Sequence, residues 1–184
     1  MKKAAFLDRD GVINEKAPEG AYITRWEDVR FLPGIAEAIA QLNLAGFQVI
    51  IISNQRCVAK GLITTAELET LHRRMVEWLS ARGAVVNAVY YCPHEKTQPP
   101  CDCRKPSPGM LLQAAKEHAI DLSQSWMIGD SESDVKAGHA AGCKTVRIQM
   151  SDTTNPTSAD LTVSTIRDAV PTILSKAYRY KSLI

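Results

Sequence analysis

Short apolar runs alternate with amphipathic segments along the chain, and this alternation limits the possible folds more than any other feature. The run Val49-Ile50-Ile51-Ile52 is continuous and β-branched, which is typical of a strand buried on both faces. Alternating strands and helices indicate an α/β domain with a central parallel sheet. We predict further strands at residues 4–7, 88–91, 126–128, 145–148 and 161–163, and helices after Pro33-Gly34, Thr64, Pro108 and Gly129 and around residues 166–174.

The length of 184 residues favours one domain spanning 1–184, closed by the strand and helix of residues 161–178, with a polar loop at 151–160. A net charge of +2 gives no field for nucleic acid, so no nucleic-acid partner is expected. No apolar run approaches the roughly 20 residues of a membrane span. The short run after Met1-Lys2-Lys3 is no signal peptide, so a cytoplasmic location is expected. The size of the chain is compatible with a monomer, and a monomer is expected.

Unusual polar residues follow four of the predicted strands. The carboxyl ends of parallel strands meet at one edge of a sheet, where ligands bind in this architecture. Asp and Gly after a strand are most often ordinary turn residues, but four such segments in order make coincidence a poor explanation. The segments are Asp8-Arg9-Asp10-Gly11, Ser53-Asn54-Gln55, Arg104-Lys105 and Gly129-Asp130, with Asp134 shortly afterwards.

Carboxylates gathered in one crevice repel one another, and a divalent cation with hard oxygen ligands, such as Mg²⁺, resolves the repulsion. A carboxylate can also attack phosphorus and form an aspartyl-phosphate. Lys105, Ser53 and backbone N–H groups near Gly11 would supply positive charge and donors to a phosphoryl group. The second carboxylate of the Asp8-x-Asp10 pair is placed for general acid and then general base work.

These four segments resemble the motifs of the haloacid-dehalogenase (HAD) superfamily of phosphatases. The resemblance covers roughly residues 3–148 and implies a Rossmann-like three-layer sandwich. It implies Asp8 as nucleophile, Asp10 as acid and base, and Ser53 and Lys105 as stabilisers of the phosphoryl group. Magnesium would be held by Asp8, the backbone carbonyl of Asp10, and Asp130, while Asp134 would orient Lys105 or a water on the metal. The gaps between motifs leave no room for a folded cap domain, so the site should be open and favour hydrolysis.

Five cysteines cannot all pair, and three of them lie within twelve residues. Cys92, His94, Cys101 and Cys103 form a Cys₃His set in a Pro-rich segment with few apolar residues to fold it. A zinc ion would fold this loop of residues 92–103, and four protein ligands make it structural rather than catalytic. The two remaining cysteines, Cys57 and Cys143, are expected to be small core residues.

The string from Cys92-Pro93-His94 to Cys101-Asp102-Cys103-Arg104-Lys105-Pro106 resembles the D-glycero-D-manno-heptose 1,7-bisphosphate phosphatases of lipopolysaccharide-core or S-layer sugar biosynthesis. The histidinol-phosphate phosphatases share this string and remain an alternative, and the short stretch 95–100 is nearer to their pattern. The resemblance implies substrate contacts from Arg104 and Tyr22, and from Asn54 and Gln55 beside Ser53. Arg56 stands where the heptose family has serine, and Ser131 where it often has lysine, so Arg56 is expected to replace that charge near the substrate.

Two functions of other classes remain open. A phospho-receiver signalling domain also uses an aspartate cluster, a hydroxyl and a lysine, but its phosphoryl group should persist, whereas the Asp8-x-Asp10 pair favours turnover. A zinc-dependent nucleic-acid module lacks support because the chain has no basic aromatic stripe. Among other residues, Trp26 is expected to be a packed aromatic, and the helical histidines, His72 included, are expected to be exposed or half-buried.

Overall fold

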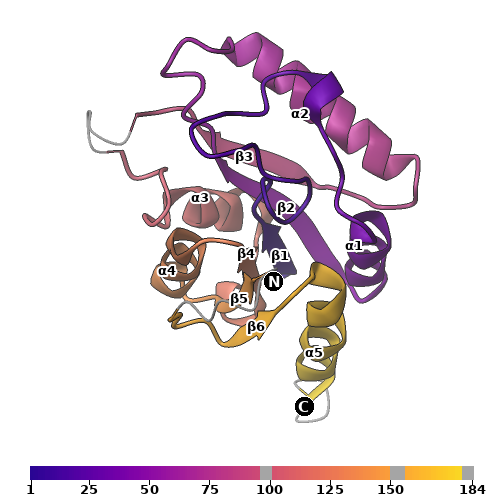
Figure 1. Ribbon diagram of the computed structural model, residues 1–184. Coiled ribbons are helices and arrows are strands. Elements are labelled where there is room, and N and C mark those ends of the chain that lie inside the picture. Colours follow the sequence, from indigo (N-terminus) through magenta and orange to yellow (C-terminus); the bar gives the residue numbers. More distant parts are fainter. Residues whose placement is uncertain (96–100, 150–155, 180–184) are drawn as a thin grey trace.

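A computed structural model describes residues 1–95, 101–149 and 156–179 (Figure 1). Part of the expected zinc loop, 96–100, and part of the polar loop, 151–155, lie outside the described residues. The strands are β1 (Lys3–Leu7), β2 (Phe47–Asn54), β3 (Ala88–Cys92), β4 (Trp126–Gly129), β5 (Lys144–Ile148) and β6 (Leu161–Val163). They form one sheet in the order β3-β2-β1-β4-β5-β6, and every neighbouring pair is parallel.

Helices cover both faces of this sheet, as predicted. The helices are α1 (Ile35–Leu44), α2 (Thr65–Ser80), α3 (Gly109–His118), α4 (Glu132–Ala141) and α5 (Ile166–Arg179), with short turns η1 (Trp26–Asp28) and η2 (Leu122–Gln124). Alternate residues of the strands face opposite layers. Val49 and Ile51 pack with α1, α2 and α5, whereas Ile50 and Ile52 pack with α3 and α4. The continuous apolar run is therefore buried on both sides, which confirms the prediction.

The strand order places the reversal of the sheet between β1 and β4. The chain runs outward from β1 through β2 to β3 along one side, and then returns to β4 and continues through β5 to β6. Leu7 at the end of β1 pairs with both Ile51 and Ile128, so β4 ends one residue beyond β1, at Gly129, and β2 ends three residues beyond it, at Asn54. A crevice outside such a reversal point is where ligands bind in open α/β sheets.

No cap domain is inserted near this crevice in the part of the chain that the structure describes. Between β1 and β2 lie a loop, η1 and α1, and between β2 and β3 lies α2 with its flanking loops. The expected capless fold is thus observed. None of the helices in the described ranges combines the length and apolar character needed to cross a bilayer.

An aromatic stack fastens the loop after β1 to helix α2. Phe31 and Trp78 stack with ring centroids 3.7 Å apart, and Trp26 meets Phe31 edge-on at 6.0 Å. Cations close both ends of the stack, because Arg74 lies over Trp26 and Arg82 over Trp78. Trp26 is therefore a packed aromatic, as the sequence indicated, and the stack holds the loop against the body of the domain.

Helix boundaries show where side chains act as caps. Thr64 and Glu67 form the predicted capping box at the start of α2. Helix α3 begins at Gly109, one residue after the expected Pro108, and the N–H of Gly109, which has no partner within the helix, donates to the carbonyl of Asp102 at 2.9 Å. A Cβ on Gly109 would lie 2.2 Å from that carbonyl oxygen, so this contact between helix and loop depends on glycine.

Candidate active site

The residues expected to carry the chemistry converge at the carboxyl ends of the central strands. Asp8 directly follows β1, and its N–H donates to the carbonyl of Ile128 on β4. Asp130 follows β4, and Asp134 lies in the first turn of α4. Lys105 enters from the loop between β3 and α3. Four segments far apart in sequence therefore bring their functional groups to one place.

Lys105 is the buried centre of this group, with 3% of its surface exposed. Its Nζ lies 2.9 Å from Asp8 Oδ1 and 2.6 Å from Asp134 Oδ1, and it donates to the carbonyl of Ile52 at 2.7 Å. Burial acts to lower the pKa of Lys105, but the two carboxylates outweigh burial and raise it above its usual value. The lysine is therefore a fixed cation held between two acids.

Three carboxylates, from Asp8, Asp130 and Asp134, lie with one oxygen each within 4.8 Å of one another. Burial, only partly offset by Lys105, raises the pKa of Asp8 to about 7, and the Asp134 and Asp130 carboxylates add to the rise. Burial also raises the pKa of Asp130, against the effect of Lys16. The cluster therefore carries more buried negative charge than its neighbouring cations neutralise.

This imbalance fits a divalent cation. Asp130 Oδ1 is buried and has no hydrogen-bond partner within the described ranges, while its other oxygen pairs with the ammonium of Lys16 from the loop after β1. An unpaired buried carboxylate oxygen beside a second carboxylate offers the hard oxygen donors that Mg²⁺ prefers. Gly11 permits this close packing, since at φ +87° a Cβ there would lie 2.1 Å from Asp130 Oδ2.

Asp10 is held apart from the three clustered carboxylates by donors of its own. Arg9 contacts both of its oxygens at 3.0–3.2 Å, Asn14 donates to Oδ1 at 2.9 Å, and Gln55 donates to Oδ2 at 3.1 Å. Burial alone would raise the pKa of Asp10, but Arg9, Asn14 and Gln55 together lower it below its usual value. Asp10 is thus an oriented carboxylate that holds its negative charge.

The segment after β2 supports the other groups. Ser53 is buried, and its Oγ accepts from Gln55 Nε2 at 2.8 Å. Asn54 makes two hydrogen bonds with the backbone of Lys105, accepting from its N–H and donating to its carbonyl, each at 3.1 Å. Asn54 and Gln55, expected to contact substrate, are therefore engaged in holding Lys105 and Asp10.

The other residues expected to contact substrate make contacts within the protein. Arg56 Nε is 3.1 Å from Glu95 Oε1, which makes an ion pair without hydrogen-bond alignment. Arg104 NH1 donates to the carbonyl of His94 at 3.1 Å. Tyr22, in the loop after β1, packs against a small cluster that includes Cys57. Contacts of the two arginines and Tyr22 with the substrate therefore stay predictions.

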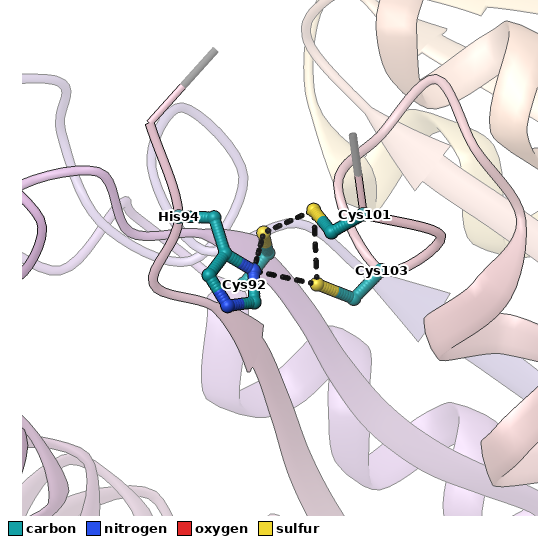
Figure 2. A group of neighbouring side chains, drawn as sticks. All are labelled: Cys92, His94, Cys101 and Cys103. Carbon is teal, nitrogen blue, oxygen red and sulfur yellow. Dashed lines mark hydrogen bonds between the residues drawn. The ribbon is translucent and has the colours of Figure 1, made fainter. Parts of the chain in front are cut away.

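Figure 2 shows the side chains of Cys92, His94, Cys101 and Cys103 pointing toward one another. Neighbouring Sγ and Nδ1 atoms are separated by 3.2–3.6 Å around the group. Tetrahedral ligands at the usual zinc–sulfur length of about 2.3 Å lie roughly 3.5–3.8 Å apart, so the donor set and its spacing fit Zn²⁺. Cys57 and Cys143 are buried elsewhere, as expected.

Four functional contacts were missed from the sequence. His72 was expected to be exposed or half-buried, and this is wrong, because only 4% of its surface is exposed. Arg9, Asn14 and Lys16 were assigned no role. Arg9 lies between Asp8 and Asp10, the two acids predicted to be catalytic, and that position is the one signal in the sequence. His72 and Lys16 contact segments that are remote in sequence, and the contact of Asn14 with Asp10 depends on the geometry of the loop. The sequence pattern reveals neither.

Comparison with known proteins agrees with this site. A family model described as HAD-hydrolase-like matches residues 102–171. A D-glycero-β-D-manno-heptose-1,7-bisphosphate 7-phosphatase from Rhodopseudomonas palustris is 44% identical over 157 residues, covering 82% of this chain and 86% of that protein. The enzyme of the same name from Haemophilus ducreyi is 36% identical, covering 92% and 97%. The crystal structure of D,D-heptose 1,7-bisphosphate phosphatase from B. bronchiseptica, complexed with magnesium and phosphate, superposes with a TM-score of 0.85 at 32% identity, covering 95% and 99%.

Proposed function

Since the chain belongs to the D-glycero-D-manno-heptose-1,7-bisphosphate 7-phosphatase family of HAD phosphatases, we propose that it removes the C7 phosphate of this heptose bisphosphate through an aspartyl-phosphate on Asp8. One observation carries the assignment of roles. The buried Lys105 ammonium lies between Asp8 and Asp134, at the edge of the sheet where β1 and β4 meet. This arrangement keeps a nucleophilic carboxylate beside a fixed cation, as phosphoryl transfer requires.

In the first step an oxygen of Asp8 attacks phosphorus, and the bond between phosphorus and the sugar oxygen breaks. Asp10 gives a proton to the departing oxygen, which would otherwise leave as a poor alkoxide. The incoming phosphate dianion adds negative charge beside Asp10, which raises its pKa and favours the protonated form that this step needs. We expect Lys105, which lies beside Asp8, and the buried Ser53 hydroxyl to stabilise the phosphoryl oxygens.

In the second step Asp10, now a carboxylate, takes a proton from a water molecule as the water oxygen attacks phosphorus. The bond between phosphorus and Asp8 breaks, which releases inorganic phosphate and restores the Asp8 carboxylate. The low pKa that Arg9, Asn14 and Gln55 impose on Asp10 suits it to the carboxylate form that it takes between the two steps. The two steps return every group to its starting state.

Two metals complete the proposal. Asp8, the backbone carbonyl of Asp10, and Asp130 would hold Mg²⁺, and the ion would supply positive charge to the phosphoryl oxygens. Cys92, His94, Cys101 and Cys103 would hold a structural Zn²⁺. The support for zinc is the inward-facing donor set, and its effect would be to fix the backbone that leads into Arg104 and Lys105.

We expect Arg104, Arg56 and Tyr22 to determine which substrate binds. Arg104 uses NH1 for the His94 carbonyl and has further N–H donors, which would contact the part of the sugar distant from the reacting phosphate. We expect further contacts from Arg56, which pairs with Glu95, and from Tyr22 in the loop after β1. The capless site leaves water access to the aspartyl-phosphate, which favours hydrolysis over transfer to another acceptor.

Initial rates on a panel of substrates test this function. The panel contains both anomers of D-glycero-D-manno-heptose 1,7-bisphosphate, histidinol phosphate and fructose 1,6-bisphosphate, each with Mg²⁺. We expect kcat/KM to be highest for the β anomer of the heptose, by at least about 100-fold over histidinol phosphate. A higher kcat/KM for histidinol phosphate would show that the chain is a histidinol-phosphate phosphatase instead. A stable phosphoprotein without turnover would refute the phosphatase mechanism.

A further inference from the structure

Arg9 joins the catalytic acid to a helix that supplies no catalytic group. Its guanidinium is buried, with 1% of the residue exposed, and Nε and NH2 reach both oxygens of Asp10 at 3.0–3.2 Å. On its other side NH1 lies 3.3 Å from Nε2 of His72 in α2. Asp10 is the one carboxylate that forms a salt bridge with Arg9 within the described ranges.

The chemistry of the two groups fixes the direction of the second contact. An arginine side chain has N–H donors and no acceptor, so Nε2 of His72 accepts and the ring proton resides on Nδ1. Burial and the charge of Arg9 lower the pKa of His72 to about 3, which keeps the imidazole neutral. A neutral acceptor satisfies NH1 without offering Arg9 a second anion, and the full attraction of the guanidinium remains directed to Asp10.

Arg9 sets the orientation of Asp10 more completely than its other partners do. Asn14 and Gln55 each donate to one oxygen, whereas Arg9 contacts both and thereby fixes the plane of the carboxylate. Without an acceptor for NH1, a buried N–H would be left unpaired, which is unfavourable. The guanidinium would then turn toward another acceptor, and the plane of Asp10 would turn with it.

We propose that His72 is a positioning residue for the proton transfers of the reaction, acting on Asp10 through the buried guanidinium of Arg9. The proposal rests on the role given above to Asp10 as acid and base. Proton transfer from a positioned side chain contributes roughly 100- to 10,000-fold to rate, and small errors in placement remove much of it. The residue therefore affects the chemistry without touching the substrate.

Two variants separate this role from a general structural one. His72→Leu removes the acceptor, whereas His72→Gln retains one in its side-chain amide oxygen. Two substrates are compared by kcat/KM, which reports the steps up to release of the leaving group. The heptose bisphosphate has an alkyl leaving oxygen that needs a proton, and p-nitrophenyl phosphate has a phenolate that leaves without one. Leu71→Ala, also buried in α2, is the matched control.

In His72→Leu we expect kcat/KM for the heptose bisphosphate to fall about 10- to 100-fold, and at least about tenfold more than for p-nitrophenyl phosphate. His72→Gln should restore most of the loss, and Leu71→Ala should lower stability while leaving the ratio between substrates unchanged. If His72→Leu lowers kcat/KM equally on both substrates, or leaves the ratio between them unchanged, the positioning role is overturned. Turnover by wild type would still support the proposed function in that case. Wild type inactive on both substrates would overturn both.

Discussion

The burial of His72 predicts a pH dependence of stability that a single substitution should remove. Burial and the Arg9 cation lower its pKa in the folded protein to about 3, from 6.5 for the free side chain. Other ionisable groups nearby are Asp10, which opposes this shift, Glu69, Arg73 and Glu77 on α2, and Tyr91 on β3.

The sign and size of the effect follow from this shift. Between about pH 6.5 and pH 3 the unfolded chain binds a proton at His72 and the folded chain does not, so the free energy of unfolding falls as the pH falls through this range. Above about pH 6.5, the pKa of His72 in the unfolded chain, neither state binds this proton and the free energy of unfolding keeps its full value. At about pH 5, roughly 1.5 pH units below it, the loss is about 2 kcal/mol, since each unit is worth about 1.4 kcal/mol.

Urea unfolding of wild type and His72→Leu at about pH 7.5 and about pH 5 measures this term. Other groups titrate in both proteins, so the quantity of interest is the difference between their two pH effects. We expect wild type to lose about 2 kcal/mol more than the variant on acidification. Equal losses in the two proteins would refute the conclusion that His72 is neutral and buried in the fold.

Four further substitutions test individual groups. Asp8→Asn should lower turnover by several orders of magnitude with an unchanged circular dichroism spectrum; activity near wild type would identify another nucleophile. Cys101→Ala should lose the bound zinc in elemental analysis, and wild type prepared without chelators should contain it. Asn54→Ala should lower the free energy of unfolding by about 2–4 kcal/mol, because it removes two hydrogen bonds to Lys105, and should reduce kcat. Arg104→Ala should raise KM for the heptose bisphosphate about tenfold while KM for p-nitrophenyl phosphate stays constant.

The sequence predicted the framework because the framework follows from local patterns. The β-branched run of residues 49–52 identified a strand with two buried faces, and that burial requires helices on both sides of the sheet. Polar residues after strands then had to meet at one edge, so Asp8, Lys105 and Asp130 could be placed together before any coordinates were known.

Contacts made by single side chains across long stretches of chain could not be predicted in the same way. Asn54 follows Ser53 and was expected at the substrate, but it bonds the backbone of a residue 51 positions away. His72 has helical neighbours of ordinary amphipathic pattern, and its partner Arg9 is 63 positions away. Such pairings depend on how two loops and a helix approach one another in space. No periodicity in the sequence indicates which residues this approach brings together.

The stack that fastens the loop after β1 also gives the protein an intrinsic optical probe. The protein has three tryptophans. Trp26 and Trp78 lie in that stack, and Trp126 is buried in β4. The same loop carries Lys16 to Asp130. Indole fluorescence should therefore report on this loop, whose other end contacts Asp130 in the carboxylate cluster, and ligand titrations could be followed without attaching a dye.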